Sequence, residues 1–287
     1  MTEKDNRYLI VGLGLMGGGY AQGLSSLGMH VAAIDRDPDS IAFGIENGYI
    51  EKGSTDADPT LIASSDRIIF ALYPEIFIKW MEENAHLIRP GTLLTDVTGV
   101  KSPVVSRIQE LLPEGAEFIA SHPMAGREVY GVRNSSSVIF KNANFIITPT
   151  EKNTEEGIEW CRSLAVSLGF RKISVISPAE HDYMIAFVSQ LTHCIAVTLM
   201  TCNNNTHLAD YTADSFRDLT RIANINDEMW SSLFIMNKEF LLDQMDSFIR
   251  EFGELRDLVE NEDYEGLKKK MRLSSKRRKA FDLKEKQ

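Results

Sequence analysis

The segment 7–35 constrains the fold more than any other part of the chain. An apolar run precedes the pattern Gly12-x-Gly14-x-x-Gly17, and a small-residue helical pattern and a second apolar run ending at Asp35 come after it. The first glycine allows a tight turn, the second lets the backbone approach a pyrophosphate, and the third lets the helix pack closely on the strand. The positive end of the helix dipole then faces the phosphates. The segment therefore predicts binding of a nicotinamide or flavin dinucleotide.

Asp35 indicates which dinucleotide is preferred. It lies 18 residues after Gly17, about where the ribose-binding acid of such a site falls. A carboxylate there accepts hydrogen bonds from the ribose hydroxyls and repels a 2′-phosphate, which favours NAD. Arg36 comes directly after it and could hold that phosphate, so NADP is the less favoured alternative.

Composition narrows the class of protein. The formal net charge of −10 over 287 residues argues against nucleic acid and anionic membranes as partners. The charged start MTEKDNR does not resemble a signal peptide, and we expect no run long enough to span a bilayer. Cys161, Cys194 and Cys202 lack metal-ligand spacing, which indicates reduced, mostly buried thiols and no metal site. We expect a cytoplasmic protein.

Strand-like and helix-like patterns alternate up to residue 177, which is typical of an α/β, doubly wound parallel sheet. From Ser177-Pro178 onward the periodicity is almost entirely helical. We therefore expect a dinucleotide-binding domain over residues 1–177 and an all-α substrate and dimerisation domain over 178–287. A short hinge with a substrate cleft beside it would join them.

The helical half contains three long predicted helices, 179–202, 213–222 and 228–259. The last keeps apolar residues at helical spacing for about nine turns. An apolar stripe of that length needs another surface to cover it, and a second copy of the chain is the expected partner.

A histidine stands out after the predicted strand 117–120. His122 begins the segment HPMAGRE, which we expect to form a tight loop at the carboxyl end of the sheet. An imidazole near neutrality can accept a proton from a hydroxyl while hydride leaves the same carbon. The alternative is a loop histidine that only caps a backbone group.

A polar stripe is expected on the first long helix. Asp182, Ser189 and His193 are 7 and 11 residues apart, which at about 100° per residue places them on one face. His181 would point well away from His193. The stripe could line a wet cavity, or it could be a buried network that only fixes helix packing.

Two further segments carry candidate groups. Arg221, between Leu219 and Ile222, offers a guanidinium fork suited to a substrate carboxylate. Thr98 and Ser102 lie in a strand-to-helix turn, where either could cap the next helix or reach the cofactor or the histidine loop.

The motifs GLGLMGGG, TDVTGVKSPV, SHPMAGRE, PAEHDYMIAFVSQLTH and FRDLTRIANINDEMW, in this order, resemble the prephenate/arogenate dehydrogenases of tyrosine biosynthesis. The resemblance implies a Rossmann domain, a helical dimerisation domain and a homodimer. It also implies NAD-dependent oxidative decarboxylation of prephenate to 4-hydroxyphenylpyruvate and CO2, with arogenate to tyrosine as a possible variant.

The resemblance assigns roles by motif position. His122 would polarise and deprotonate the 4-hydroxyl, and His193 would help place cofactor and substrate. Many relatives have a serine that orients the catalytic histidine where this chain has Gly99, so Thr98 or a water would take that role. The expected substrate-binding residues are Arg221, Ser189, Asp182, Glu128 and Trp230. The expected cofactor-binding residues are Gly12, Gly14, Leu15, Met16, Gly17, Asp35, Arg36, Leu72 and Thr98.

Two other hypotheses are open. β-Hydroxyacid and 6-phosphogluconate-type dehydrogenases share the GLGxMG opening and a helical second domain, but they use a lysine on the helix after the hinge, and residues 179–202 contain none. A non-catalytic dinucleotide-binding module is the other; it predicts NAD binding without turnover.

Overall fold

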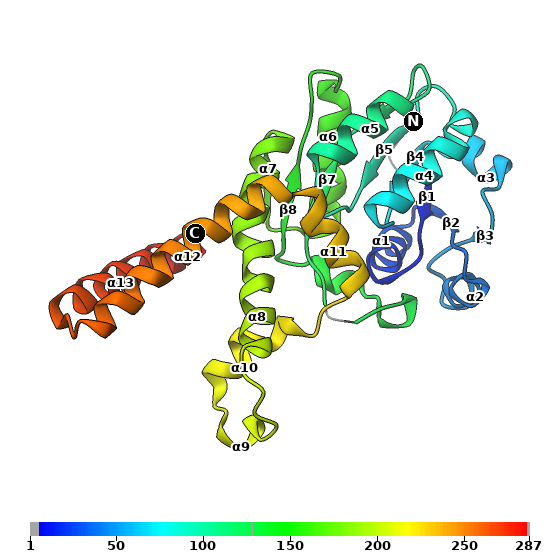
Figure 1. Ribbon diagram of the computed structural model, residues 1–287. Helices are drawn as coiled ribbons and strands as arrows, with labels where there is room; N and C mark the ends of the chain where they lie inside the picture. Colours follow the sequence, from blue (N-terminus) through cyan, green and yellow to red (C-terminus); the bar gives the residue numbers. More distant parts are fainter. Residues whose placement is uncertain (1–5, 128, 286–287) are drawn as a thin grey trace. The chain divides into compact units, whose positions relative to one another are not determined.

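The computed structural model describes residues 6–127 and 129–285 (Figure 1). By its internal contacts the chain forms two compact units, one ending at Asn237 and the other beginning at Lys238. The first unit contains both sheets and the helices up to α11. The second contains α12 and α13.

A six-stranded parallel sheet organises the first unit, with the strand order β3-β2-β1-β4-β5-β6. Its strands are β1 Arg7–Val11, β2 His30–Ile34, β3 Lys52–Ser54, β4 Arg67–Phe70, β5 Leu93–Asp96 and β6 Glu117–Phe118. This is the order of a doubly wound dinucleotide-binding sheet, so the predicted fold class is confirmed. The order reverses between β1 and β4, and ligands of such sheets bind at the carboxyl ends of the strands that flank this point.

Helices connect the strands and cover both faces of the sheet. They are α1 Leu15–Ser26, α2 Pro38–Glu46, α3 Pro59–Ser64, α4 Pro74–Asn84, α5 Ser102–Leu111 and α6 Glu155–Ser167, with short 3-10 helices η2 Ala85–Leu87, η3 Val132–Asn134 and η4 Ser137–Phe140. The side chains of strand β1 alternate between two hydrophobic cores, one on each face of the sheet. Tyr8 and Ile10 belong to the core that includes residues of α1 and α6, whereas Leu9 and Val11 belong to the core that includes residues of α4 and α5.

Three strands form a second, smaller sheet that sequence analysis did not predict. Here β7 (Ser121–Met124) pairs antiparallel with β8 (Asn144–Ile147), which pairs parallel with β9 (Lys172–Val175). The alternating pattern places 144–148 and 172–176 within the parallel sheet, because alternation along the chain does not reveal which strands share a sheet. His122 consequently lies in a strand opposite Ile146 and not on a loop.

The predicted helix 179–202 is one helical run with a change of geometry inside it. It consists of α7 (Pro178–Ile185), the π-helix η5 (Ala186–Leu191) and α8 (Thr192–Thr201). A π-helical turn accommodates about one extra residue, which rotates the next residues of the run by roughly 100° relative to an α-helix. The expectation that Asp182, Ser189 and His193 share a face assumes a straight α-helix and is wrong.

The remaining helices of the first unit are α9 Leu208–Tyr211, α10 Asp214–Thr220, η6 Arg221–Ala223 and α11 Asp227–Met236. The second unit consists of α12 Lys238–Glu260 and α13 Tyr264–Glu285. The predicted helix 228–259 is therefore two helices. Asn237 ends α11 with backbone angles (φ −113°, ψ 25°) that leave the α-helical region.

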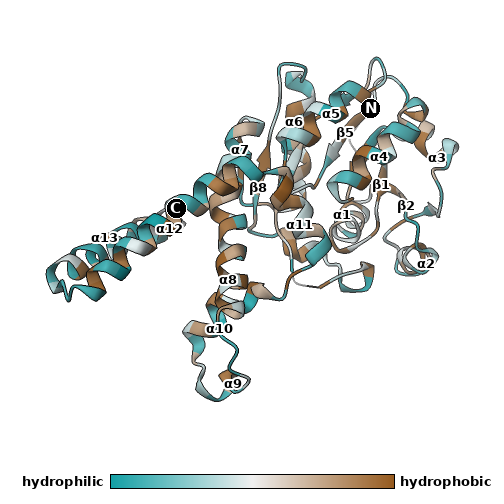
Figure 2. Ribbon diagram, in the orientation of Figure 1, coloured by the Kyte–Doolittle hydropathy of each residue, from teal (hydrophilic) through white to brown (hydrophobic). Residues whose placement is uncertain are grey.

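In the part of the chain that the structure describes, one helical run, Pro178–Thr201, is long and apolar enough to cross a membrane by length and composition, with a mean hydropathy of 1.6. Figure 2 shows the apolar colouring along α8. The expectation that no run reaches this length is wrong. Single polar residues interrupt the apolar stretches of this helical run, but its mean hydropathy stays high. Two of them, Asp182 and Gln190, are buried and hydrogen-bonded within the first unit.

The three cysteines are free thiols, and they differ in exposure. Cys161 is buried, Cys194 is half-buried and Cys202 is exposed. The expectation of mostly buried thiols is therefore wrong for Cys202, which lies just after the end of α8.

Candidate active site

The glycine turn between β1 and α1 has the shape that a pyrophosphate requires. Gly12 has φ +93°, and a Cβ built there would lie 2.6 Å from the carbonyl oxygen of Ala71, at the end of β4. A Cβ on Gly17 would lie 1.9 Å from the carbonyl oxygen of Gly12. At Gly14, in contrast, no heavy atom of the described residues comes within 4 Å. Gly12 and Gly17 thus require glycine for packing, whereas Gly14 leaves the start of α1 open to a ligand.

The end of β2 supplies the ribose side of the same site. The Asp35 carboxylate accepts hydrogen bonds from the backbone N–H of Leu13 (2.5 Å) and of Asp37 (2.9 Å), so its position beside the glycine turn is fixed. Leu72 is adjacent, since its Cδ2 lies 2.8 Å from a Cβ built on Gly12. Arg36 is exposed. These residues fit an adenine dinucleotide with a free ribose diol; their individual contacts with it stay predictions, as do those of the half-buried Leu15 and Met16.

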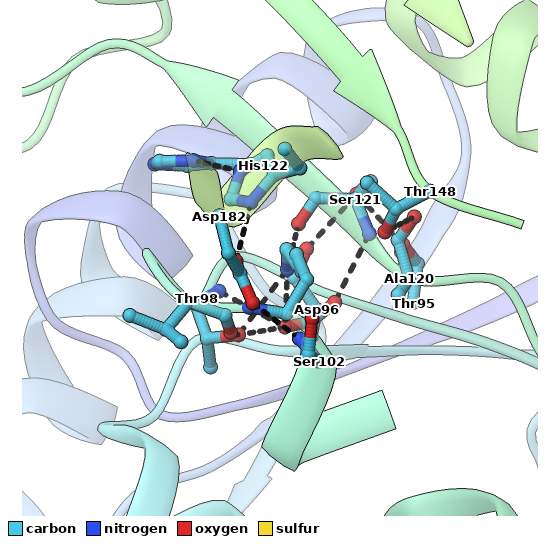
Figure 3. A network of polar contacts seen from close by, with 12 residues as sticks. Thr95, Asp96, Thr98, Ser102, Ala120, Ser121, His122, Thr148 and Asp182 are labelled. Carbon is cyan, nitrogen blue, oxygen red and sulfur yellow. Dashed lines mark hydrogen bonds and ion pairs between the residues drawn. The ribbon is translucent and has the colours of Figure 1, made fainter. Parts of the chain in front are cut away.

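A chain of three side chains lies at the junction of β7 and α7 (Figure 3). His122 Nδ1 is 2.9 Å from His181 Nε2, and His181 Nδ1 is 2.8 Å from Asp182 Oδ1. A carboxylate only accepts, so the Nδ1–H of His181 donates to it and the neutral His181 ring accepts at Nε2. His122 must then donate from Nδ1. This proton arrangement leaves Nε2 of His122 as a lone-pair acceptor.

The environment keeps both imidazoles neutral. Burial, with added repulsion from His181 and Lys101, holds the pKa of His122 well below its ordinary value of 6.5. Burial also lowers the pKa of His181, although its hydrogen bond to Asp182 opposes the shift. For Asp182, burial raises the pKa, but hydrogen bonds from His181 and from the start of α5 outweigh it and leave the pKa below the usual range. The base at Nε2 of His122 is therefore unprotonated near neutral pH.

Asp182 also caps a helix from a distance. Its two carboxylate oxygens accept the backbone N–H groups of Lys101 (2.8 Å) and Ser102 (2.7 Å) at the start of α5. The expectation that Thr98 or Ser102 caps this helix is wrong, because the carboxylate from α7 occupies the place of a local cap. Asp182 is 1% exposed, so the prediction that it touches substrate has no support from its position.

Beneath His122 lies a buried ion pair. Lys101 Nζ is 2.7 Å from Asp96 Oδ2, and both residues are 0% exposed. Asp96 also accepts the N–H of Ser121 (3.0 Å), the residue before His122, and Lys101 Nζ donates to the Ser121 carbonyl. The pair ties the end of β5 to the start of β7 and so positions the strand that carries His122.

Thr98 does not take the role that the sequence predicts for it. Its hydroxyl donates to Asp96 and lies 3.1 Å from the carbonyl oxygen of Val100, and it accepts from Lys101 Nζ (3.2 Å). The hydroxyl thus belongs to the ion pair, and the described partner of the His122 ring is His181. The prediction that Thr98 orients the catalytic histidine is wrong. Thr98 is also 3% exposed, so its predicted contact with the cofactor has no support here.

Gly99 faces the histidine directly. A Cβ built there would lie 4.0 Å from His122 Cε1 and 3.5 Å from Leu233 Cδ1. Both are ordinary van der Waals distances, so the position has room for a small side chain next to the imidazole. His122 is oriented by His181, which contacts Nδ1, the ring nitrogen next to Cε1.

His193 and Trp230 form a second part of the site. Their rings stack with centroids 3.6 Å apart and planes inclined by 29°. His193 Nδ1 lies 2.9 Å from the carbonyl oxygen of Ser189, so the backbone of Ser189 contacts His193. The stack joins α8 to α11. That the two residues line a substrate pocket stays a prediction.

Two predicted substrate residues stay predictions. Arg221 is exposed at the start of η6, which packs against α8, the helix of His193. Its role as a carboxylate clamp stays a prediction. Glu128 lies outside the described residues.

Comparisons with known proteins agree with this geometry. A family model described as the nucleotide-binding domain of prephenate dehydrogenase matches residues 21–173, and one described as its dimerization domain matches residues 177–273. The prephenate dehydrogenase of Bacillus subtilis is 31% identical over 278 residues, which cover 93% of this chain and 74% of that protein. The chain belongs to the prephenate dehydrogenase family.

Other members of the prephenate dehydrogenase family show the range of the likeness. A cyclohexadienyl dehydrogenase of Zymomonas mobilis is 29% identical over 203 residues, which cover 69% of each chain. A solved prephenate dehydrogenase from Aquifex aeolicus, in complex with hydroxyphenyl propionate and NAD+, superposes with a TM-score of 0.89 at 26% identity and covers 98% of this chain and 100% of its own. The family membership expected from the motifs is thus confirmed.

Sequence analysis missed several residues of the site. On a straight helix His181 would point away from His193, yet it is the partner of His122. Its signal is the His-Asp pair near the start of the helix that begins at Pro178. Lys101 gives no such signal, because its role depends on contacts between elements that are separate in the sequence.

Proposed function

We propose that this protein catalyses the NAD-dependent oxidative decarboxylation of prephenate to 4-hydroxyphenylpyruvate and CO2. One observation carries the proposal. His122 sits at the carboxyl-end side of a dinucleotide-binding sheet, is neutral, and keeps Nε2 as a proton acceptor through its hydrogen bond to His181. Family membership and the ligands of the Aquifex aeolicus relative support the choice of substrate class and cofactor.

The reaction balances with one base. The bound nicotinamide supplies the hydride acceptor. His122 takes the proton of the 4-hydroxyl through Nε2 while hydride leaves the same ring carbon. The ring carboxylate then departs as CO2, and its bonding electrons pass through the ring to the oxygen at C4. The proton returns from His122 to that oxygen, so one hydride is transferred, no net proton is released, and the product is a phenol.

The other residues of the site would bind and orient. We assign the stacked pair His193 and Trp230 to one wall of the substrate pocket and Arg221 to a substrate carboxylate. His181 and Asp182 fix the His122 proton on Nδ1 from the protein side. We assign residues 1–177 to a nucleotide-binding domain and residues 178–287 to a helical substrate and dimerisation domain.

The proposal extends to the oligomeric state, the cellular location and the pathway of the enzyme. Exposed apolar side chains, among them Tyr183, Phe187 and Val188, lie along the run Pro178–Thr201. Because residues 177–273 match a dimerization domain, we assign this face to a homodimer, not to a lipid bilayer. We place the enzyme in the cytoplasm and in tyrosine biosynthesis, with no nucleic acid or membrane as partner.

Arogenate is the second candidate substrate, because one relative, from Methanocaldococcus jannaschii, is described as a probable arogenate/prephenate dehydrogenase. Prephenate and arogenate differ in a keto or an amino group on the side chain, remote from the carbon that His122 would serve.

NADH formation, measured by absorbance with prephenate, arogenate and 6-phosphogluconate in parallel, tests the proposal. We expect turnover with prephenate. Absence of turnover with both prephenate and arogenate would exclude the function, and NAD binding without turnover would favour a non-catalytic module.

His122→Asn is the matched variant. We expect kcat to fall by roughly a thousandfold, because one general base is worth about 10²–10⁴ in rate. NAD affinity, measured by calorimetry, should stay close to that of the parent. Near-normal turnover of the variant would show that another group takes the proton.

A further inference from the structure

We infer that Gln190 and Asn237 are positioning residues that hold α11 against the π-helix η5 and so set the His193–Trp230 wall of the pocket. The inference rests on the proposed function for its kinetic readout, but its structural readout is independent. Neither residue contacts His122, His193 or Trp230 in the hydrogen bonds that the structure describes, and both act through the helices on which those residues stand.

The two amides form one buried hydrogen-bonded unit. Asn237 Nδ2 donates to Gln190 Oε1 (2.8 Å) and lies 2.9 Å from the carbonyl oxygen of Asp182. Gln190 Nε2 donates to the carbonyl oxygen of Leu233 (3.0 Å). Gln190 is 1% exposed and Asn237 5%. A neutral amide pair of this kind links three segments, namely α7, η5 and α11, without burying a charge.

The pair closes the end of α11. The Leu233 carbonyl also accepts the backbone N–H of Asn237 (3.2 Å), so Gln190 provides a second donor for a carbonyl in the last turn. Asn237 then breaks the helix, and its side chain turns back to Gln190 and Asp182. Loss of either amide would leave buried polar groups without partners, so the helix would have to shift to recover them.

Such a shift would reach the pocket at two points. Trp230 lies on α11 one turn before Leu233 and stacks on His193 of α8. The Leu233 side chain itself lies beside Gly99, next to His122. Because η5 is the segment where the helical run departs from α-helical geometry, Gln190 fixes the rotation of the His193 helix as well as the position of α11.

The glycine turn of the cofactor site makes no described hydrogen bond with the two amides. Gly12 packs against the end of β4, and the Asp35 carboxylate accepts the backbone N–H of Leu13 in the glycine turn. The pair should therefore affect substrate binding and leave NAD binding nearly unchanged. This pattern separates a positioning role from a general loss of stability.

Gln190→Met tests the inference, since methionine has a similar volume and cannot make the two hydrogen bonds. We expect KM for prephenate to rise about tenfold, with KM for NAD within twofold of the parent and a smaller effect on kcat. Thr92→Val is the matched control. It removes a buried hydrogen bond, from Thr92 to the Ser65 carbonyl, at the amino end of the sheet, and should leave both KM values unchanged.

A spectroscopic test does not need turnover. The chain has three tryptophans, so fluorotryptophan labelling gives three ¹⁹F resonances, and Trp230→Phe assigns one of them. In Gln190→Met the Trp230 resonance should move, and those of Trp80 and Trp160 should not. Gln190→Asn, shorter by one methylene, provides the same test if the methionine variant does not fold.

The double variant Gln190→Met/Asn237→Leu should be no worse in KM than the more impaired single variant, because the two amides act as a unit. Unchanged KM for prephenate together with an unmoved Trp230 resonance would overturn the inference, as would equal effects on both substrates' KM values. If the parent protein does not turn over prephenate or arogenate, the proposed function fails, and the ¹⁹F result alone decides whether the pair positions Trp230.

Discussion

At the scale of single residues, the environment of His122 decides its chemistry more than its identity does. The ring has two nitrogens, and the bond to His181 assigns the donor proton to the one facing the protein. Sequence analysis could find His122 from its place after a predicted strand. It could not find His181, because the pairing joins residues 59 positions apart across two elements.

Gly99 gives a residue-scale prediction. A serine there would fit, with its Cβ 4.0 Å from His122 Cε1. His122 Nδ1 is already bonded to His181, so the new hydroxyl meets no vacant protein-side nitrogen. We expect Gly99→Ser to change kcat by less than twofold in steady-state assays.

The opposite result would be informative. A missing orienting hydrogen bond is worth about 1 kcal/mol, or roughly fivefold in rate. A rise in kcat of that size in Gly99→Ser would mean that His181 orients the ring poorly. Gly126→Ser, on a glycine with open space around it and farther along the chain after β7, serves as the control substitution.

At the scale of elements, β7 and α7 each contribute one neutral histidine to the same buried chain of hydrogen bonds. The sequence predicted a strand before His122 and a helix after Pro178, and both exist. It missed that β7 belongs to a second sheet and that the helical run changes to π geometry at η5. Neither change has a local sequence signal, because both are set by packing between elements.

The two neutral histidines, His122 and His181, predict how the stability of the protein depends on pH. Both imidazoles have pKa values below 6.5 in the folded protein, so below that pH the unfolded chain binds more protons than the folded one. The free energy of unfolding should therefore be level above about pH 7.5 and fall as the pH drops below about 6.5. The limiting slope is ~1.4 kcal/mol per pH unit for each histidine.

Urea unfolding across this range measures the effect. The double variant His122→Asn/His181→Gln removes both titrating groups and should flatten the slope below about pH 6.5. The carboxylate of Asp182, whose pKa is lowered, loses its contribution only at more acidic pH and does not interfere. An unchanged slope in the double variant would assign the acid sensitivity to other groups.

At the scale of the whole molecule, the alternating pattern up to residue 177 was enough to predict the doubly wound sheet, and the helical remainder was predicted as well. The strand order, the break at Asn237 and the contact-defined unit ending there were not readable from the chain. They depend on which buried surfaces meet, whereas periodicity reports only that a surface is apolar.

Assembly gives the prediction at this scale. Phe187 is 54% exposed on the apolar run Pro178–Thr201, the face that we assign to the dimer. A charge there would be desolvated in the interface, so we expect Phe187→Glu to be monomeric by light scattering at concentrations where the parent is a dimer.

Ile45→Glu is the control, because Ile45 is 47% exposed on α2, outside the run Pro178–Thr201. It should leave the dimer intact. A dimeric Phe187→Glu variant would place the contact between copies on another surface.

The carboxylate of Asp182 has a consequence for how such enzymes can be recombined. It completes the first turn of α5 and holds His181 against His122, so residues 1–177 depend on the later part of the chain both for a helix cap and for the hydrogen-bond partner of the catalytic histidine. In a chimaera whose first 177 residues came from another dehydrogenase, the catalytic histidine of that enzyme would be oriented by His181 and Asp182 of this chain. The two parts therefore have to match at this carboxylate.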